Sequence, residues 1–365
     1  MTVVPNYTAL LIIPTGIGAA MGGYAGDALP IARAIAQSVD CLITHPNVLN
    51  GAQLYWPIPN ALYVEGYGLD QVATGRWGLR PVYQNRIGLV LDAAIELDLR
   101  WRHLQAADAA RATLGIAMTD YVVTDAPLGV TLNTAQSGAT WGTIERPDSV
   151  LRAAEALIGA GAEAIAVVAR FPDDNESEAL QQYRQGQGVD PLAGAEAVIS
   201  HLVVKTFCIP CAHAPALSPL PLDPAISPRS AAEEIGYTFL PCVLAGLSRA
   251  PQFVCRPSSN PTVIAPASIW ADQINAVVIP ESACGGAAVL GLSQTSTHII
   301  TVRDNTTAMN VCPDALGITT ISVQSYLEAI GVIIADRAGI QPHRLTPAIA
   351  PIRSIAAPTP ATFCD

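Results

Sequence analysis

The stretch INAVVIPESACGGAAVLGLSQTSTHIITVRDNTTAMNV, residues 274–311, carries the clearest fold signal in the chain. It contains two short apolar runs rich in β-branched residues, 276–279 and 298–302, with a small-residue helix candidate between them. Two such runs separated by a helix predict neighbouring parallel strands. The polar residues that follow each run are then delivered to the same edge of a sheet.

The same order of apolar run and polar exit recurs along the whole chain. Runs at 9–13, 41–44 and 87–91 alternate with helix-like segments such as 149–161. This alternation predicts an α/β protein with a largely parallel sheet or sheets, helices on both faces, and two Rossmann-like lobes around a cleft. Ligands of open parallel sheets bind outside the carboxyl ends of the strands. The side chains predicted at such ends are Thr15, His45, Glu65, Asp92, Asp125, His213, Glu281 and Arg303.

A polar segment suggests how the chain is divided. Residues 173–188 form its most polar run, for which a linker, a lid and a plain solvated loop are all possible. We therefore expect an N-terminal α/β lobe with a Gly-rich loop at 1–172 and a C-terminal α/β lobe at 189–345. Residues 346–365 are expected to form a mobile tail.

Composition restricts the partners. Half of the 365 residues are hydrophobic and only 13% are charged, which predicts a homo-oligomer that covers apolar surface. The net charge is -11 without a basic run, so nucleic acid is not an expected partner. No uninterrupted apolar window of ~18 residues occurs, so no membrane partner is expected either. Eight cysteines, several of them in apolar runs, are typical of reduced core thiols and predict a cytoplasmic location.

A Gly-rich loop, PTGIGAAMGGYAGDALP at residues 14–30, follows the first apolar run. Glycines permit positive φ and let backbone N–H groups approach an anion. A phosphate or carboxylate site and a tight-packing or subunit-contact loop explain the pattern about equally well, and the spacing is not that of a dinucleotide fingerprint. Asp27 is the expected cap of the helix that comes next. The candidate ligand-binding residues of the loop are Thr15, Gly16, Gly18, Gly22 and Gly23.

Cys284 lies where the run 276–279 gives way to a helix, and Glu281 precedes it by three residues. A helix N-terminus lowers the pKa of a thiol, and a nearby carboxylate can carry a proton. This pair is typical of thiol-based racemases, isomerases or acyl-transfer enzymes. An equally weighted alternative is a small residue under a tight turn, because no G-x-S-x-G elbow is present.

His45 and His213 are the candidate acid/base histidines. A lone histidine is more often a structural hydrogen-bonding residue, but a place at a strand exit favours a role in a site. Asn47, Glu65 and Asp125 lie at or near further exits and are candidate ligand-binding residues.

Arg303 ends the second apolar run, and Asn305 and Thr306 follow it. A guanidinium at this place suits a carboxylate or phosphate, with the amide and the hydroxyl as further hydrogen-bond partners. The alternative is an ion pair between Arg303 and Asp304 that braces the loop. Together with the Gly-rich loop, Arg303 predicts a small anionic ligand.

Cys208, Cys211 and His213 have a C-x-x-C-x-H spacing that suggests a metal. A structural zinc site needs four ligands, usually from two such motifs, and the sequence holds no second one. A buried strand exit explains the segment better, so no metal site is predicted.

Four long motifs carry a family resemblance: THPNVLNGAQLYWP, ATWGTIERPDS, GQGVDPLAGAEAVISH and AAEEIGYTFLPCVLAGLSRAP. They resemble a family known as a conserved domain of unknown function, found in cyanobacteria and plant plastids, and the likeness extends to about Gly339. The resemblance implies a cytosolic or stromal setting. It implies no activity and transfers no catalytic residue.

The first functional hypothesis is a metabolic enzyme that acts on a small anionic molecule by acid/base or thiol chemistry, of isomerase, racemase, lyase or acyl-transfer type. Its candidate catalytic residues are Glu281, Cys284, His45 and His213. The second hypothesis is a non-catalytic ligand-binding or oligomeric assembly protein. The third is a metalloprotein that uses Cys208, Cys211 and His213. No particular cofactor is indicated.

Overall fold

The computed structural model describes residues 6–49, 56–173, 177–235, 239–255, 268–347, 351–352 and 354. Most of the tail expected at 346–365 therefore lies outside the described residues. The sequence also predicts a short strand that begins at Gln252 and ends at Arg256, and Arg256 lies outside the described residues as well.

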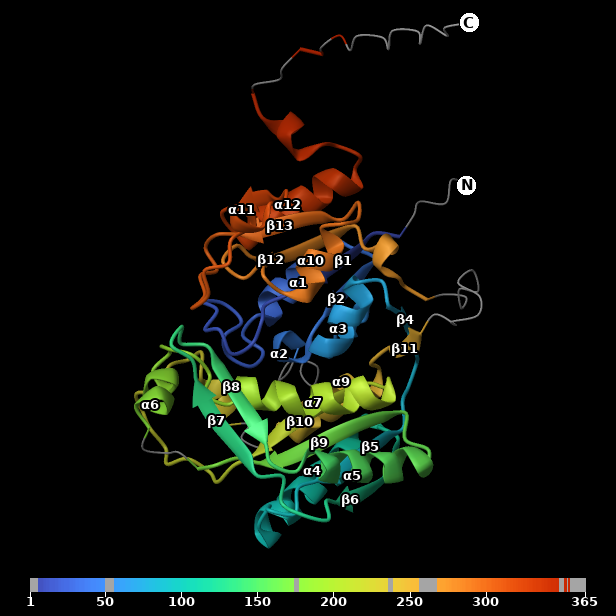
Figure 1. Ribbon diagram of the computed structural model, residues 1–365, viewed down its shortest axis with the longest axis vertical. Coiled ribbons are helices and arrows are strands. Elements are labelled where there is room, and N and C mark those ends of the chain that lie inside the picture. The colour runs from blue at the N-terminus through green and yellow to red at the C-terminus, as the bar shows by residue number, and fades with distance from the viewer. Residues whose placement is uncertain are drawn as a thin grey trace, which may run out of the picture.

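The strands and helices alternate along most of the chain (Figure 1). The strands are β1 Thr8–Leu11, β2 Cys41–Thr44, β3 Ala61–Tyr63, β4 Trp77–Arg80, β5 Ile87–Leu91, β6 Met118–Val123, β7 Val130–Thr134, β8 Thr140–Ile144, β9 Ala164–Arg170, β10 Cys211–Ala216, β11 Gln252–Cys255, β12 Ala276–Pro280, β13 His298–Val302 and β14 Ile321–Val323. The helices are α1 Leu29–Ala36, α2 Pro46–Leu49, α3 Gly66–Ala73, α4 Leu97–Leu114, α5 Pro147–Gly159, α6 Glu178–Arg184, α7 Ala193–Phe207, α8 Ala231–Ile235, α9 Leu240–Ser248, α10 Ala287–Leu292, α11 Pro313–Leu316 and α12 Tyr326–Arg337. Two 3-10 turns, η1 Ala271–Gln273 and η2 Pro342–Leu345, complete the set.

The larger sheet has six strands in the order β14-β13-β12-β1-β2-β3, and every pair is parallel. Successive side chains point to opposite faces. In β1, Leu11 packs towards α1 and α12, whereas Leu10 packs towards α3 and α10. Both residues are almost fully buried, which explains why these strands have continuous apolar runs rather than alternation. This sheet and its helices are called the six-stranded lobe.

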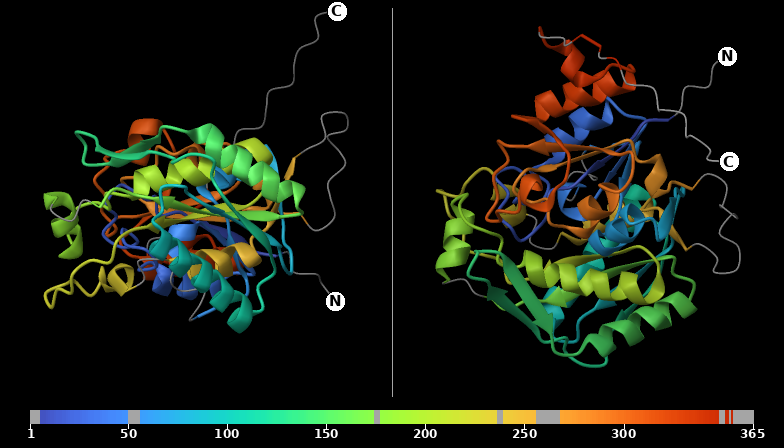
Figure 2. Two further views of the ribbon diagram at one scale, coloured as in Figure 1. Left: turned by 90° about the horizontal axis from the view of Figure 1, so that it is seen from below. Right: turned by 45° about the horizontal axis from the view of Figure 1, so that its top comes forward.

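The smaller parallel sheet has the order β10-β9-β5-β6 and, with its helices, forms the four-stranded lobe. Leu89 and Leu91 of β5 face α4 and α9, and Val90 faces α5 and α7. Figure 2 shows helices on both faces of this sheet. The predicted fold class, α/β with largely parallel sheets and helices on both faces, is confirmed.

The lobes divide the chain differently from the division expected at 173–188. The six-stranded sheet combines residues 8–63 with residues 276–323, and the four-stranded sheet is built from residues 87–216 between them. The chain therefore crosses between the lobes twice. Strand pairing over such a separation depends on tertiary contacts, which a pass along the sequence does not show.

Two small antiparallel pairs accompany the main sheets. β7 and β8 form a hairpin, and β11 pairs with β4 near the two crossings. The strand predicted to end at Arg256 is present over Gln252–Cys255, although it belongs to this antiparallel pair and to neither parallel sheet.

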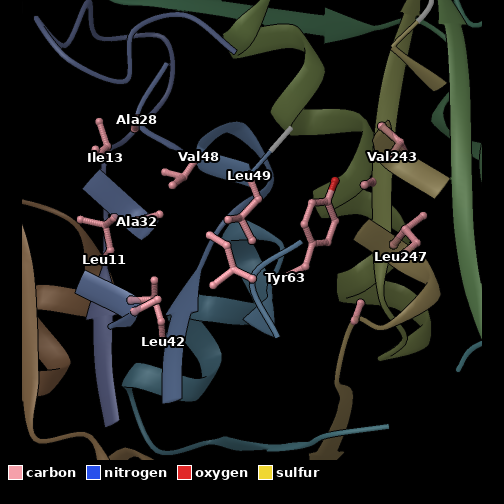
Figure 3. Packing of buried hydrophobic residues seen from close by; sticks show 14 of the residues in the cluster. Leu11, Ile13, Ala28, Ala32, Leu42, Val48, Leu49, Tyr63, Val243 and Leu247 are labelled. Atoms are coloured by element: carbon pink, nitrogen blue, oxygen red, sulfur yellow. The ribbon is translucent and has the colours of Figure 1, made fainter. Parts of the chain in front are cut away.

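One continuous apolar cluster joins the lobes (Figure 3). Tyr63 of β3 and Leu49 of α2 meet Val243 and Leu247 of α9, and all four side chains are buried. A Cβ at Gly246 would lie 2.5 Å from the Tyr63 ring, so glycine permits this close contact.

Two helix boundaries differ from expectation. Asp27 does not cap α1, whose N-cap is Ala28; it pairs instead with Arg229. The last long helix is expected from the sequence to be capped by Ser322. Its cap is instead Ser325, which accepts a hydrogen bond from the backbone N–H of Glu328, and Ser322 belongs to β14. From the sequence, one long helix is expected over residues 229–250, kinked or split in two by Pro241. The structure divides it: α8 ends at Ile235 and α9 begins at Leu240.

Helix α7 lies directly on the β7–β8 hairpin because glycines remove side chains from the contact. A Cβ at Gly194 would lie 2.3 Å from the carbonyl oxygen of Thr140 and 2.4 Å from Cα of Trp141, both backbone atoms. A Cβ at Gly142 would lie 2.3 Å from that of Ala195. This contact fixes the start of α7.

We therefore expect Gly194→Ala to lower the free energy of unfolding by ~1–3 kcal/mol, because backbone has to move to accommodate the methyl group. The matched control is Gly159→Ala in α5, where a Cβ would meet nothing within 4 Å. It should leave stability unchanged or raise it by up to ~1 kcal/mol, since alanine favours the helix. Urea unfolding of both variants checks this, and equal midpoints would contradict it.

Candidate functional site

A cavity of about 440 Å³ lies between the two lobes. Its walls come from the loops after β1, β2, β3 and β12, from α3, α7 and α10, from β10, and from the segment around α6 and α8. Five residues predicted from the sequence line it: Thr15, His45, Asn47, Glu65 and His213. The predicted exits of β1, β2 and β3 therefore form one wall of the cavity.

His45 is held neutral at the exit of β2. Its Nε2 accepts a hydrogen bond of 3.0 Å from the backbone N–H of Ile13, so the ring proton resides on Nδ1. Burial lowers the pKa of His45 to about 4, because the charged ring would be desolvated. At neutral pH His45 is therefore a hydrogen-bond donor and no cation.

A chain of polar side chains connects the two lobes across the cavity. Glu65 accepts from the backbone N–H of Gly68 at the start of α3, and its other oxygen lies 2.9 Å from Nε2 of His201 and 3.4 Å from Oγ of Ser200. Ser200 Oγ lies 3.1 Å from Nδ1 of His213, whose Nε2 is 3.6 Å from Glu196. Residues 196, 200 and 201 share one side of α7 because four residues make about one helical turn. The arrangement could move a proton between the lobes.

The charge of His201 depends on this chain. Burial by itself would lower its pKa, but the hydrogen bond and charge of Glu65 and the charge of Asp70 outweigh burial and raise it.

Two carboxyl groups at the four-stranded side of the cavity have no basic partner among the ion pairs of the described residues. Asp190 accepts from the backbone N–H of Leu192 at 2.8 Å, and Glu233 accepts from the hydroxyl of Tyr183 at 2.7 Å. Burial raises the pKa of Glu233 to about 7, with the charges of Glu196 and Asp27 adding to the effect. Burial, Glu233 and Glu196 raise the pKa of Asp190 well above its usual range. Such a pair retains a proton under conditions where ordinary carboxyl groups are ionised.

The cavity is acidic overall. Six carboxyl side chains and three histidines line it, whereas no lysine or arginine belongs to the lining that the structure describes. The carboxyl residues are Glu65, Asp70, Asp190, Glu196, Glu233 and Glu234, and the histidines are His45, His201 and His213. This balance does not match the small anionic ligand expected from the sequence.

Glu281 and Cys284 do not line the cavity, although Ala283 and Gly286 beside them do. Glu281 accepts from Ser322 at 2.6 Å, which turns it towards β14. Cys284 is fully buried. Burial, with Cys312 and Glu281 nearby, raises the pKa of its thiol to about 11, so the prediction of a lowered thiol pKa is wrong. Burial outweighs any effect of the six-residue helix that follows.

Arg303, Asn305 and Thr306 also lie away from the cavity lining. Arg303 is exposed. Asn305 is buried and bonds both backbone groups of Met21, at 2.9 and 2.8 Å, while the carbonyl of Thr306 accepts from Ala20. Asn305 and Thr306 therefore brace the Gly-rich loop. Asp125 is an exposed partner of Arg152 at 2.7 Å and lies outside the lining as well.

The glycines of the loop serve packing. Gly16, Gly18 and Gly22 have φ of 71°, 59° and 90°, and a Cβ at Gly22 would lie 2.6 Å from the side chain of Ile13. A Cβ at Gly23 would lie 2.4 Å from the carbonyl oxygen of Ala19. None of the four lines the cavity. Of the two explanations left open by the sequence, the tight-packing loop accounts for these contacts.

The three residues suggested as metal ligands, Cys208, Cys211 and His213, do not converge on one site. Cys208 Sγ lies 3.2 Å from Cys255 Sγ, Cys211 is buried, and His213 belongs to the polar chain. His213 also occupies the middle of β10 and not its exit. Within the described ranges no group of three histidine, cysteine or acidic residues is arranged to hold a metal ion.

Sequence reasoning missed Asp190, Glu196, Ser200, His201 and Glu233. A usable signal existed in GVDPLAGAEAVISH, where an acid, a serine and a histidine recur at helical spacing within an otherwise apolar helix. Glu233 gave no comparable signal, because AAEE reads as an exposed helix start.

The fold and the cavity define a two-lobed α/β protein with an acidic site between its lobes. The chain belongs to the family described as "Protein of unknown function (DUF3326)", which matches residues 8–346. It is 61% identical over 342 residues, 94% of each chain, to a Synechococcus sp. protein named "Uncharacterized lipoprotein syc1174_c". The family resemblance carried by the four long motifs is confirmed.

The expected cytoplasmic location is contradicted by this relative, which is named a lipoprotein. Reduced-looking cysteines were weak evidence, since a buried thiol resists oxidation in any compartment. In the part of the chain that the structure describes, no helix combines the length and apolar character needed to span a bilayer.

A solved structure, the periplasmic ribose ABC transporter from Conexibacter woesei, shows a distant likeness. It is 14% identical, covers 57% of this chain and 89% of its own, and gives a TM-score of 0.18. A score at this level carries no argument about shape or function.

We expect Glu65→Gln to lower the pKa of His201, because the neutral amide removes the main interaction that favours the charged ring. An NMR titration of the imidazole resonances measures this directly. The control is Glu155→Gln, an exposed change on α5. If His201 titrates at the same midpoint in Glu65→Gln and wild type, the assigned partner is wrong.

A second expectation concerns stability against pH. The folded pKa of Glu233, about 7, lies above its ordinary value of 4.5, so between these values the folded protein binds more protons than the unfolded chain. The contribution of Glu233 to the free energy of unfolding therefore falls as pH rises through this window. The change in melting temperature from pH 5 to 8 should be less negative in Glu233→Gln than in wild type or Glu155→Gln, and an unchanged slope would refute the assignment.

Proposed function

We propose that the protein is an acid/base enzyme that acts on a small polar molecule in the cavity between its lobes. The observation that carries the proposal is Glu233, a carboxyl group that faces the cavity and has no basic partner among the described residues. Burial raises its pKa to about 7. A general acid or base works best when its pKa is near the operating pH. Carboxyl groups perturbed by burial in a cleft occur preferentially at functional sites.

The two walls supply different groups. The six-stranded lobe offers the Nδ1–H donor of His45 and the carboxylate of Glu65. The other wall offers Asp190, Glu233 and His213. Reactions that remove a proton on one side of a molecule and return it on the other need a donor and an acceptor on opposite walls, as in isomerases and racemases. This arrangement favours such a reaction over thiol chemistry, because Cys284 lies off the cavity.

The lining charge favours a ligand with amine or hydroxyl groups. A cation gains from the ionised carboxyl groups of the lining, and hydroxyls can donate to carboxylates and accept from protonated carboxyl groups. The competing possibility is the small anion predicted from the sequence. It could bind beside Asp190 and Glu233 only when these two carboxyl groups are protonated and therefore uncharged.

The test is a thermal-shift screen followed by hydrogen exchange from solvent. We expect small amines or polyols to raise the melting temperature more than matched carboxylates and phosphates. Each hit is then incubated with the protein in D₂O, and NMR follows the loss of its carbon-bound protons. Wild type should exchange one such proton, and Glu233→Gln should do so ~10²-fold or more slowly, the usual contribution of a general acid or base.

Glu155→Gln is the control for both steps. Equal exchange by Glu233→Gln and wild type would eliminate Glu233 as the acid/base group. Hits that bind without exchange would favour the non-catalytic ligand-binding protein. If carboxylates and phosphates raise the melting temperature most, the ligand is the small anion predicted from the sequence.

A further inference from the structure

Cys208 and Cys255 form a close pair of thiols outside the cavity. Their Sγ atoms are 3.2 Å apart, although the residues are 47 positions apart in the chain. Cys208 follows the last residue of α7, and Cys255 is the last residue of β11. Cys255 is exposed and Cys208 is partly buried, so the pair is accessible from solvent.

The backbone at Cys208 supports a role for its side chain. Cys208 ends α7 in the left-handed conformation, with φ of 55°, while its N–H donates to the carbonyl of Val204 at 2.9 Å. Glycine is the residue that closes helices in this conformation without strain. A cysteine in this conformation has a steric cost that glycine would avoid. The favourable feature of its side chain at this position is the contact with Cys255.

The distance suits a disulfide better than any other use of two thiols. A disulfide bond measures ~2.05 Å, and small rotations of two side chains can close a gap of this size when the sulfurs already touch. A metal needs further ligands, and the described residues offer no such group. We propose that Cys208 and Cys255 form a reversible disulfide that fastens the end of α7 to β11.

The chemistry requires a disulfide oxidant such as oxidised glutathione. The exposed Cys255 loses its proton to solvent and attacks one glutathione sulfur; the S–S bond of glutathione breaks and the other half leaves as a thiolate. Cys208, after losing its own proton, attacks Cys255 Sγ and displaces the second glutathione. Two protein thiols lose two electrons together, and oxidised glutathione gains them as two thiols.

The disulfide would act on the element that carries the site. Helix α7 provides Glu196, Ser200 and His201 to the cavity wall. In the β4–β11 pair, Cys255 is opposite Trp77, whose ring packs against Tyr67 of α3, with centroids 5.8 Å apart. Oxidation therefore links α7 covalently to the β4–β11 pair, which packs on α3. The crosslink restrains the two helices that carry the polar side chains of the cavity. This inference does not depend on the proposed reaction.

The experiment equilibrates the reduced full-length protein in glutathione buffers, blocks free thiols with N-ethylmaleimide under denaturing conditions, and maps the peptides by mass. In oxidising buffer, wild type should carry two fewer blocked thiols than its eight cysteines, with the Cys208 and Cys255 peptides joined within one chain. The melting temperature should rise by a few degrees on oxidation, because the crosslink restricts the unfolded chain. Amide exchange at the end of α7 should slow.

Three variants make the result decisive. Cys255→Ser and Cys208→Gly should lose the crosslink and respond equally in oxidising and reducing buffer, and Cys208→Gly should also melt higher than reduced wild type because strain is relieved. Cys312→Ser, a change at a partly buried thiol elsewhere, should keep the crosslink. Eight free thiols in oxidised wild type, a crosslink to another cysteine, or one found only between chains would overturn the proposal.

Discussion

The parallel pairing of β1 with β12 is the contact on which the rest of the structure depends. It aligns Ala9 with Ala276 and so joins the beginning of the described chain to a strand near its end. Without it the six-stranded sheet would separate into two three-stranded halves. Each half would then be joined to the four-stranded lobe by a single crossing of the chain, and the cavity between the lobes would lose one of its walls. Short apolar strands suffice because both faces of this sheet are covered.

The same sheet explains why only part of its carboxyl edge serves the cavity. The ends of β1, β2 and β3 face the four-stranded lobe and contribute Thr15, His45 and Glu65. The segment after β12 adds only apolar and glycine residues, such as Ala283 and Gly286, to the lining. The segment that follows β13 packs instead against the Gly-rich loop, which Asn305 holds. Neighbouring strands lie ~4.8 Å apart, so four steps from β3 to β13 place their ends roughly 19 Å apart. One small ligand does not span that distance.

Much of the architecture followed from the sequence, because buried parallel strands need apolar runs and glycine or proline ends them. Strand ends then supplied part of the site, including His45 and Glu65. The sequence did not predict that the two lobes alternate along the chain. Residues 276–279 have no local feature that identifies residues 9–11 as their partner strand. The acidic wall was missed because Glu233 and Asp190 look like ordinary surface acids until folding buries them. Cys284 was misjudged for the opposite reason, as local helix geometry says nothing about how deeply a thiol is covered.

The insertion of one lobe within the other also sets an order of assembly during synthesis. All four strands of the inner sheet have been translated by residue 216, whereas the outer sheet waits for residues 276–323. On the ribosome, the half-sheet of β1, β2 and β3 therefore emerges with one long edge unpaired. The inner lobe can shelter it, because Tyr63 and Leu49 pack against α9, which is complete by residue 248. The first three strands thus gain a partner surface before their own sheet can close.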